Sequence, residues 1–298
     1  MMRFVLFTML LLMLAACGPE QFNEKQYREE VESWHRKRIE NLKKADGWLT
    51  LEGLFWLESG ENSFGAAAGN ALVFPEGMPD RMGRFVLNDT VVTVHIEHGV
   101  EVTSADTLLR EGELRADVTG EPTILKWKSY SWYVIKRQEK YGIRLKNSAS
   151  PVLAGFTGIE RFPVDIKWRV PARLVPHEDK TTIPVPNVLG QIVNEPSPGS
   201  LLFTIEGREY RLDPVATAGD EEYFIVFADA SNGETTYGAG RFLTVPRVNE
   251  EGMTWIDFNR AYNPPCVFTP YATCPLPPAQ NRLDISVTAG EKVWGHHE

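Results

Sequence analysis

The stretch Val91-Val-Thr-Val-His-Ile-Glu97 repeats with a period of two. Val92, Val94 and Ile96 fall on one face of an extended chain, and Val91, Thr93, His95 and Glu97 fall on the other. Successive side chains of a strand point to opposite faces of a sheet, so this stretch predicts a strand with one buried face. Such half-buried strands are typical of antiparallel sheets.

Short apolar runs of similar appearance lie on both sides of this stretch, with turn residues between them. They cover residues 48–51, 54–57, 124–127, 132–136, 142–146, 201–205, 208–212, 223–228 and 240–245. Glu206-Gly207 joins two of the runs as a hairpin signal. Because strands do not alternate with crossover helices, we predict a mainly β fold, either an antiparallel barrel or a sandwich. Periodicity alone does not distinguish the two.

We expect residues 48–298 to form a single β-rich domain. The stretch 181–198 contains four prolines, which is compatible with a linker between two lobes. A long connection or an edge strand within one domain is the favoured interpretation, because proline is tolerated at sheet edges.

Residues 18–47 contain the one long helical pattern, which we predict to span 23–45. Asn23 followed by Gln26 has the spacing of a capping box, and Gly47 supplies a stop signal. The apolar stripe of this helix consists of Tyr27, Val31, Trp34, Ile39 and Leu42.

Residues 1–17 resemble a bacterial lipoprotein signal peptide. Arg3 precedes an apolar run from Phe4 to Leu14, which is too short for a stable membrane span, and Leu14-Ala-Ala-Cys17 follows. The resemblance implies that Cys17 is acylated and anchors the protein to a lipid bilayer in the cell envelope. Gly18 favours the outer membrane, facing the periplasm, in a Gram-negative cell. The alternative is an ordinary secretory signal with an incidental Cys17.

The net charge of −9 argues against nucleic acid as a partner, because binding phosphates requires a basic face. No metal site is predicted, since His95 and His98 are separated by an odd spacing at the end of a strand. The chain has no Gly-x-Ser-x-Gly motif, and Gly238-Ala-Gly240 lacks the remaining features of a nucleotide loop. We therefore predict no cofactor.

The stretch from Asp257 to Arg282 concentrates the polar chemistry of the chain. Asp257-Phe-Asn-Arg-Ala-Tyr-Asn-Pro-Pro-Cys266 is followed by Thr273-Cys-Pro-Leu-Pro-Pro278, and the prolines make the segment stiff. We predict that one polar cleft beside the cysteine loop gathers the candidate ligand-binding residues Arg241, Asp257, Asn259, Arg260, Tyr262 and Asn263. The two arginines could hold a small anionic ligand, because a guanidinium matches a carboxylate or phosphate.

Cys266 and Cys274 are an even pair once Cys17 is set aside. In an exported protein we expect a disulfide, which would remove about 2–3 kcal/mol of unfolded-state entropy. Free thiols would instead allow a thiol-dependent enzyme with a cysteine nucleophile.

The chain resembles the bacterial and archaeal family called domain of unknown function 1684. The matching motifs are Thr236-Tyr-Gly-Ala-Gly-Arg-Phe-Leu243, the two segments quoted above, Asn281-Arg-Leu283 and Ala289-Gly-Glu291. Upstream, Gly47-Trp-Leu-x-Leu-x-Gly-Leu-x-Trp-Leu57 and Asn62-x-x-Gly65 also match. The resemblance runs from about Trp34 to the end and implies no activity. Whether the protein is an enzyme is therefore open. The leading hypothesis is a lipid-anchored binding protein for a small anion; the alternatives are a hydrolase or thiol enzyme using Asp257 and Arg260 or the cysteines, and a structural envelope protein without a ligand site.

Overall fold

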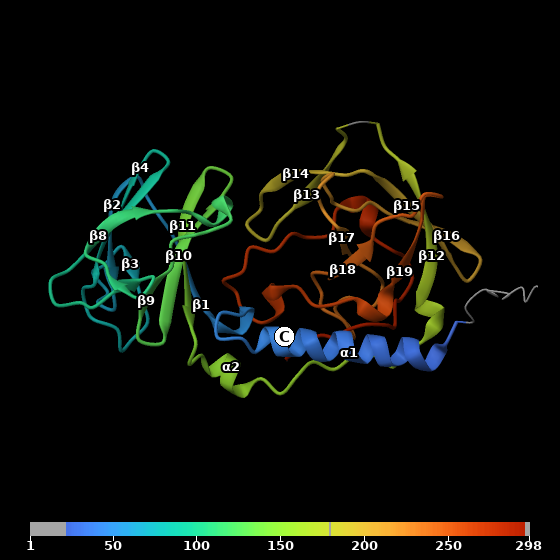
Figure 1. Ribbon diagram of the computed structural model, residues 1–298, viewed down its shortest axis with the longest axis horizontal. Helices are drawn as coiled ribbons and strands as arrows, with labels where there is room; N and C mark the ends of the chain where they lie inside the picture. The colour runs from blue at the N-terminus through green and yellow to red at the C-terminus, as the bar shows by residue number, and fades with distance from the viewer. Residues whose placement is uncertain (1–21, 179, 296–298) are drawn as a thin grey trace, which may run out of the picture.

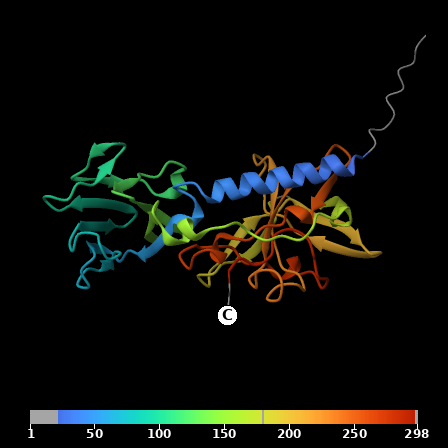
Figure 2. The same cartoon turned by 90° about the horizontal axis from the view of Figure 1, so that it is seen from below.

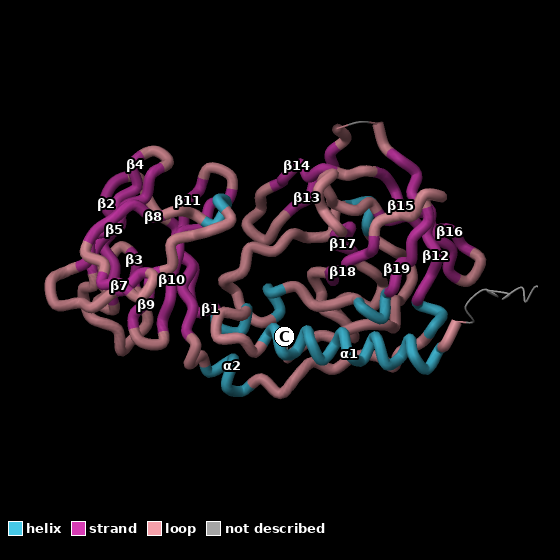
Figure 3. The backbone as a smooth tube through the Cα atoms, in the orientation of Figure 1, coloured by secondary structure: helices cyan, strands magenta, loops and turns pink. Residues whose placement is uncertain are grey.

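The computed structural model describes residues 22–178 and 180–295. Its helices are α1 (Glu24–Leu42) and α2 (Pro151–Gly155). Most of the remaining chain is strand or loop, and α1 is the one long helix of the described residues (Figure 3). Two lobes lie side by side, with β1 to β11 in the N-terminal lobe and β12 to β19 in the C-terminal lobe (Figure 1).

The N-terminal lobe contains two sheets. The first has the order β1 (Leu51–Trp56), β11 (Lys140–Asn147), β10 (Tyr130–Arg137), β9 (Leu125–Trp127), β6 (Thr103–Ser104) and β7 (Thr107–Leu108). The second has the order β3 (Leu72–Val73), β2 (Gly60–Gly65), β4 (Gly83–Asn88), β5 (Val91–Ile96) and β8 (Glu111–Leu114). Each pair of neighbouring strands is antiparallel except β2 with β3.

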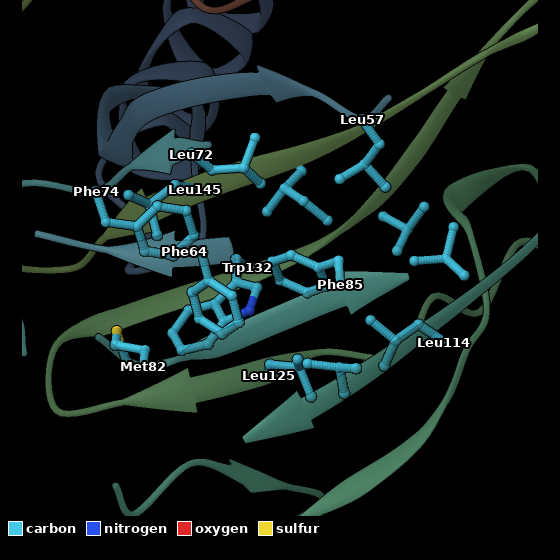
Figure 4. Packing of buried hydrophobic residues seen from close by; sticks show 14 of the residues in the cluster. Leu57, Phe64, Leu72, Phe74, Met82, Phe85, Leu114, Leu125, Trp132 and Leu145 are labelled. Carbon is cyan, nitrogen blue, oxygen red and sulfur yellow. The ribbon is translucent and has the colours of Figure 1, made fainter. Parts of the chain in front are cut away.

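The core of this lobe is formed by the buried faces of these strands. On β5, Val92 and Val94 are at most 1% exposed, and Val94 pairs across the sheet with Phe85. Phe64, Phe85 and Trp132 pack together from three different strands (Figure 4). The predicted period of two along Val91–Glu97 is therefore the pattern that builds this core.

The C-terminal lobe is built from one four-stranded sheet and two hairpins. The sheet has the order β16 (Arg208–Leu212), β15 (Gly199–Ile205), β12 (Arg169–Pro176) and β19 (Met253–Asp257). The hairpins are β13 (Thr182–Pro186) with β14 (Ile192–Pro196), and β17 (Glu222–Phe227) with β18 (Arg241–Pro246). Glu206 and Gly207 have φ values of 51° and 80°, as the tight turn between β15 and β16 requires.

Helix α1 runs along the outside of the C-terminal lobe, and its C-terminal end points toward the N-terminal lobe (Figure 2). A third hydrophobic cluster joins the two lobes at this end. It includes Leu42 of α1, Leu49, Phe156 and Phe268. Phe268 lies in the loop that follows Cys266, so the cysteine loop is part of this junction.

The prediction of a mainly β, antiparallel fold with one N-terminal helix is confirmed. The barrel alternative is wrong, because none of the sheets among the described residues closes on itself, and the arrangement is consistent with a sandwich. The capping residue Asn23 is confirmed, since its side chain accepts a hydrogen bond of 3.1 Å from the Gln26 amide. The helix ends at Leu42, and the expected strand at 48–51 begins as a 3₁₀ turn.

The unit formed by residues 48–298 contains two separate sandwich cores joined by the third cluster. Whether they fold as a single domain is a question of cooperativity and stays a prediction. The predicted division at residues 1–17 and the acylated Cys17 lie outside the described residues.

Candidate functional site

The candidate segment begins where β19 ends. Asp257 is the N-cap of a 3₁₀ turn formed by Phe258–Arg260, and its carboxylate accepts a hydrogen bond of 3.1 Å from the Asn259 amide. After the turn, Tyr262 pairs through its backbone with Phe242 of β18. This turn breaks the period of two, so the side chains of the segment point in several directions.

Arg241 lies in the interior of the C-terminal lobe, away from any opening. Its guanidinium is fully buried and forms an ion pair of 2.7 Å with Asp229. It also donates to the carbonyl oxygens of Val287 and Ala289 at 3.0 and 2.5 Å. A buried charge requires partners of this kind. The prediction that Arg241 shares a cleft with Asp257 is therefore wrong, because its side chain is fully buried and both of its Nη atoms already donate to protein groups.

Asp257 and Asn259 hold the N-terminal half of α1. The hydroxyl of Tyr27 donates to Asp257 Oδ1 at 2.7 Å, and Asn259 Nδ2 donates to that hydroxyl at 2.9 Å. Asn259 also bonds both backbone groups of Asp165, with lengths of 3.1 and 2.8 Å. Burial, the charge of Asp257 and the hydrogen bond that Tyr27 donates to Asp257 raise the pKa of Tyr27 well above its ordinary value. We call this contact the first clasp of α1.

Asn263 and Glu291 hold the second half of α1. Glu291 is 1% exposed and accepts from Arg38 Nε at 2.5 Å and from the Asn263 amide at 2.7 Å. Arg38 also donates to the carbonyl of Asn263 at 2.9 Å. His35 packs beside Glu291, and burial lowers its pKa against the opposing effect of that carboxylate. These contacts form the second clasp of α1.

Tyr262 and Arg260 complete the candidate segment. The ring of Tyr262 packs edge-on against Phe242 and lies under the Arg38 guanidinium at 4.5 Å. Burial raises the pKa of Tyr262 above its usual range. Arg260 is 35% exposed, with Nε 3.2 Å from the Asp257 carboxylate. Five of the six candidates thus lie along α1, but only Asp257 and Arg260 reach an open cavity.

Cys266 and Cys274 form a disulfide with a Cα–Cα distance of 6.2 Å. The expected pairing is confirmed. Because both sulfurs are bonded, neither cysteine provides the free thiol that the thiol-enzyme alternative requires.

An open cleft of about 860 Å³ lies between the first half of α1 and the outer face of the sheet. Its lining comprises Phe22, Asn23, Gln26, Tyr27, Glu30, Trp34, Arg169, Glu222, Thr244, Pro246, Arg247, Asn249, Met253, Thr254, Trp255, Asp257 and Arg260. Three arginines and three carboxylates are among these residues. The first clasp is part of the cleft lining, because Tyr27 and Asp257 form its hydrogen bond and also line the cleft.

Arg169 differs from the other two arginines of the cleft. Arg247 donates to the carbonyl oxygens of Thr217 and Asp220, and Arg260 lies beside Asp257. Arg169 instead packs against aromatic rings. Its guanidinium lies 4.2 Å from the ring of Trp255, 5.4 Å from Phe22 and 5.7 Å from Tyr27. Within the described part of the chain it forms no hydrogen bond or ion pair.

Sequence reasoning missed Arg169, Phe22 and Trp255. Arg169 lies directly opposite Asp257 in the β12–β19 pair, a register that no local pattern reveals. Trp255 did carry a signal, because it stands between Thr254 and Ile256, which are buried, and is itself 45% exposed. Exposed apolar residues mark a contact surface when they form a contiguous patch, and Trp255 lines the cleft together with Phe22, where both rings contact the Arg169 guanidinium.

No group of side chains in residues 22–178 and 180–295 has the composition of a metal site. Among the same residues, no helix has the length and apolar character needed to cross a membrane.

Residues 154–292 match the sequence model of the family described as Protein of unknown function (DUF1684). This part of the chain belongs to that family. The DUF1684 region starts within α2 and covers the C-terminal lobe, including all six candidate residues and both loop cysteines. The strands of the N-terminal lobe and helix α1 lie outside it. The first and second clasps therefore connect the DUF1684 region to a helix that precedes it.

Two solved structures are similar to the chain. A solution structure of an uncharacterized protein from Haloarcula marismortui has 30% identity and a TM-score of 0.41, covering 48% of this chain and 80% of that one. The FhaA FHA domain, solved in complex with the intracellular domain of Rv3910, has 13% identity and a TM-score of 0.23, covering 33% and 96%. Likenesses at these TM-scores bear on neither ligand nor partner. No curated protein matches the chain.

Proposed function

We propose that the protein binds a small anionic ligand, a carboxylate or a phosphate, in the cleft between α1 and the sheet. The supporting observation is Arg169, whose planar guanidinium lies against Trp255 and donates to no acceptor in the described residues. Stacking of this kind orients a guanidinium fork without using its donors. Arg260, 35% exposed in the same cleft, is the second cation available to the ligand.

The test compares Arg169→Gln with Arg173→Gln. Arg173 lies on the same strand and is exposed, but it does not line the cleft. A thermal-shift and calorimetric screen would use inorganic phosphate and small mono- and dicarboxylates. We expect at least one probe to stabilise the wild type and the Arg173 variant, with affinity reduced about tenfold or more in Arg169→Gln. If no probe binds the wild type, or if all three proteins bind alike, the proposal is wrong.

We further propose that the protein is anchored in the cell envelope through acylated Cys17. Phe22 of the cleft is five residues from Cys17, and five extended residues span at most about 18 Å. The anchor would hold the cleft close to the bilayer surface. Labelling with a radioactive or alkynyl fatty acid should mark the wild type and leave Cys17→Ala unlabelled; equal labelling of both would exclude the anchor.

A structural role is the second candidate, and the two clasps favour it. Asp257, Asn259 and Asn263 use their hydrogen-bonding groups on α1 and nearby backbone. Under this hypothesis the Asp257→Asn variant loses stability while no anion shifts the wild type. Under the binding hypothesis an anion shifts the wild type whatever Asp257 contributes to stability.

A further inference from the structure

Arg144 of β11 is a buried cation at the junction of the two lobes. It is 3% exposed and points away from the core of the N-terminal lobe, toward Trp48 and the disulfide loop. Within the described residues no carboxylate pairs with it. Its contacts are the Trp48 ring, 5.4 Å from the guanidinium carbon, and a hydrogen bond of 3.3 Å from Nη2 to the Thr273 hydroxyl. Its buried Nε has no acceptor.

The hydroxyl of Thr273 is the acceptor for two guanidiniums. Arg137 Nε donates to it at 3.0 Å, in addition to the Arg144 bond of 3.3 Å. A hydroxyl has two acceptor lone pairs and one proton. Both lone pairs are used, and the proton has no acceptor among the described residues. Around the Thr273 hydroxyl, hydrogen-bond donors therefore outnumber acceptors.

Positive charge is also in excess around Arg144. Arg137 is neutralised by Asp117 at 2.8 Å. Lys146, two residues along β11, has a pKa that burial lowers, and the charge of Arg144 adds to this effect while Asp46 opposes it. Among residues 22–178 and 180–295, Arg144 itself has no counter-charge. An unpaired buried charge destabilises a fold by several kcal/mol unless something compensates it.

We propose that a small anion, of the size of chloride or formate, binds at the junction of Arg144 Nε and the Thr273 hydroxyl. An anion there would accept from both groups and supply the missing negative charge. Because Arg144 is only 3% exposed, the proposal is limited to an anion of this size. Because Arg144 belongs to the N-terminal lobe and Thr273 directly precedes Cys274, the anion would connect the two lobes. In Figure 1 a red loop of the C-terminal lobe reaches toward the N-terminal lobe, and the hydrogen bonds of Thr273 to Arg137 and Arg144 join the two lobes.

The experiment measures the melting temperature of the full chain in sodium chloride, formate and gluconate at equal ionic strength. Gluconate, which is much larger than chloride or formate, serves as the comparison anion. For the wild type we expect chloride and formate to raise the melting temperature by about 3 °C or more at tenfold the dissociation constant, relative to gluconate. Arg144→Met should lose this difference. Arg84→Met, at an exposed arginine of β4 paired with Glu61, should keep it. Arg169→Gln should also keep it, which separates this site from the cleft.

A second measurement covers the case in which Arg144→Met does not fold. Line broadening of the ³⁵Cl resonance by the wild type should be reversed by formate and not by gluconate. Thr273→Val, which removes the hydroxyl and retains the charge, should weaken the broadening severalfold. The proposal is overturned if the wild type melts alike in chloride and gluconate, if Arg144→Met retains the difference, or if the broadening does not respond to formate.

Discussion

The guanidinium of Arg241 and the carboxylate of Asp229 form a fully buried pair, at 2.7 Å, inside the C-terminal lobe. Asp229 also accepts from the Ser231 amide and from the Val287 amide, at 2.9 and 3.1 Å. The pair therefore links the start of β18 and the segment after β17 to the loop that contains Val287. At the scale of single residues, this network explains the buried polar groups around Arg241 by packing and not by ligand binding.

Breaking this pair should be costly. We expect Arg241→Met and Asp229→Asn each to lower the free energy of unfolding by about 3–5 kcal/mol, because each leaves one buried charge uncompensated. The double variant should recover part of that loss. Denaturant titrations would measure the changes, with Arg173→Met as an exposed control expected to stay within about 0.5 kcal/mol. Single variants as stable as the control would show that the pair contributes nothing.

His35 provides a pH-dependent test of the second clasp. Its folded-state pKa is depressed by burial, and Arg161 and Arg38 add to this effect while Glu291 opposes it. As pH falls through about 6.5, the unfolded chain takes up the proton first, so the wild type loses stability. Glutamine does not titrate, so the His35→Gln variant does not undergo this loss of stability.

The comparison is made between pH 8 and pH 5. The stability of His35→Gln relative to wild type should rise steadily as the pH is lowered through this window. Measuring the difference cancels the other titrating groups. A difference that stays constant across the window would mean that His35 has an ordinary pKa.

At the scale of elements, α1 is an amphipathic helix docked by two clasps of polar contacts. Only Tyr27, Val31 and Leu42 of the helix are buried. The apolar face is therefore narrow, and a helix of this length is marginal by itself in water. The clasps supply the specificity of docking, and they fix the wall of the cleft.

Arg38 and Arg36 offer a matched comparison on this helix. Arg38 pairs with the buried Glu291, whereas Arg36 is exposed. Arg38→Met should cost on the order of 3 kcal/mol, because it leaves the Glu291 carboxylate buried with less compensation. Arg36→Met should be close to neutral. Hydrogen exchange would follow α1 directly, and equal protection of the helix in both variants would contradict the clasp.

At the scale of the whole molecule, the two sandwich cores share a third cluster around Phe268. Phe268 is 6% exposed and its ring lies 5.2 Å from Trp294 and 6.2 Å from Phe156. This cluster includes residues from α1, from the 3₁₀ turn that precedes β1 and from the disulfide loop. Shared apolar burial couples the stability of the two lobes.

We expect one calorimetric transition for the wild type. Phe268→Ala should lower stability by about 3–5 kcal/mol, and it should broaden or split the transition because the coupling cluster is lost. Ile192→Ala, at a side chain 62% exposed, is the control. Two resolved transitions in the wild type would refute the prediction of one cooperative domain.

Much of the fold follows from local pattern. Alternation at Val91–Glu97, the turn at Glu206-Gly207 and the Asn23 cap each correspond to the observed element, because period, turn chemistry and capping act over a few residues. The disulfide is also local, closing a separation of 8 residues. The choice of sandwich over barrel depends on how distant strands pair, which these signals do not carry.

The candidate site shows the same division between what local sequence predicts and what long-range packing decides. Sequence by itself determined that the stretch from Asp257 to Asn263 is polar and stiff and must find partners. Only the tertiary structure decided which partners they find. Tyr27 of α1 binds Asp257 across 230 residues of sequence, and Arg38 of α1 binds Glu291 across 253. The same long-range packing buries Arg241 and places Arg169 opposite Asp257. A polar group's need for a partner is set by its own chemistry, whereas the identity of that partner depends on contacts distant in sequence.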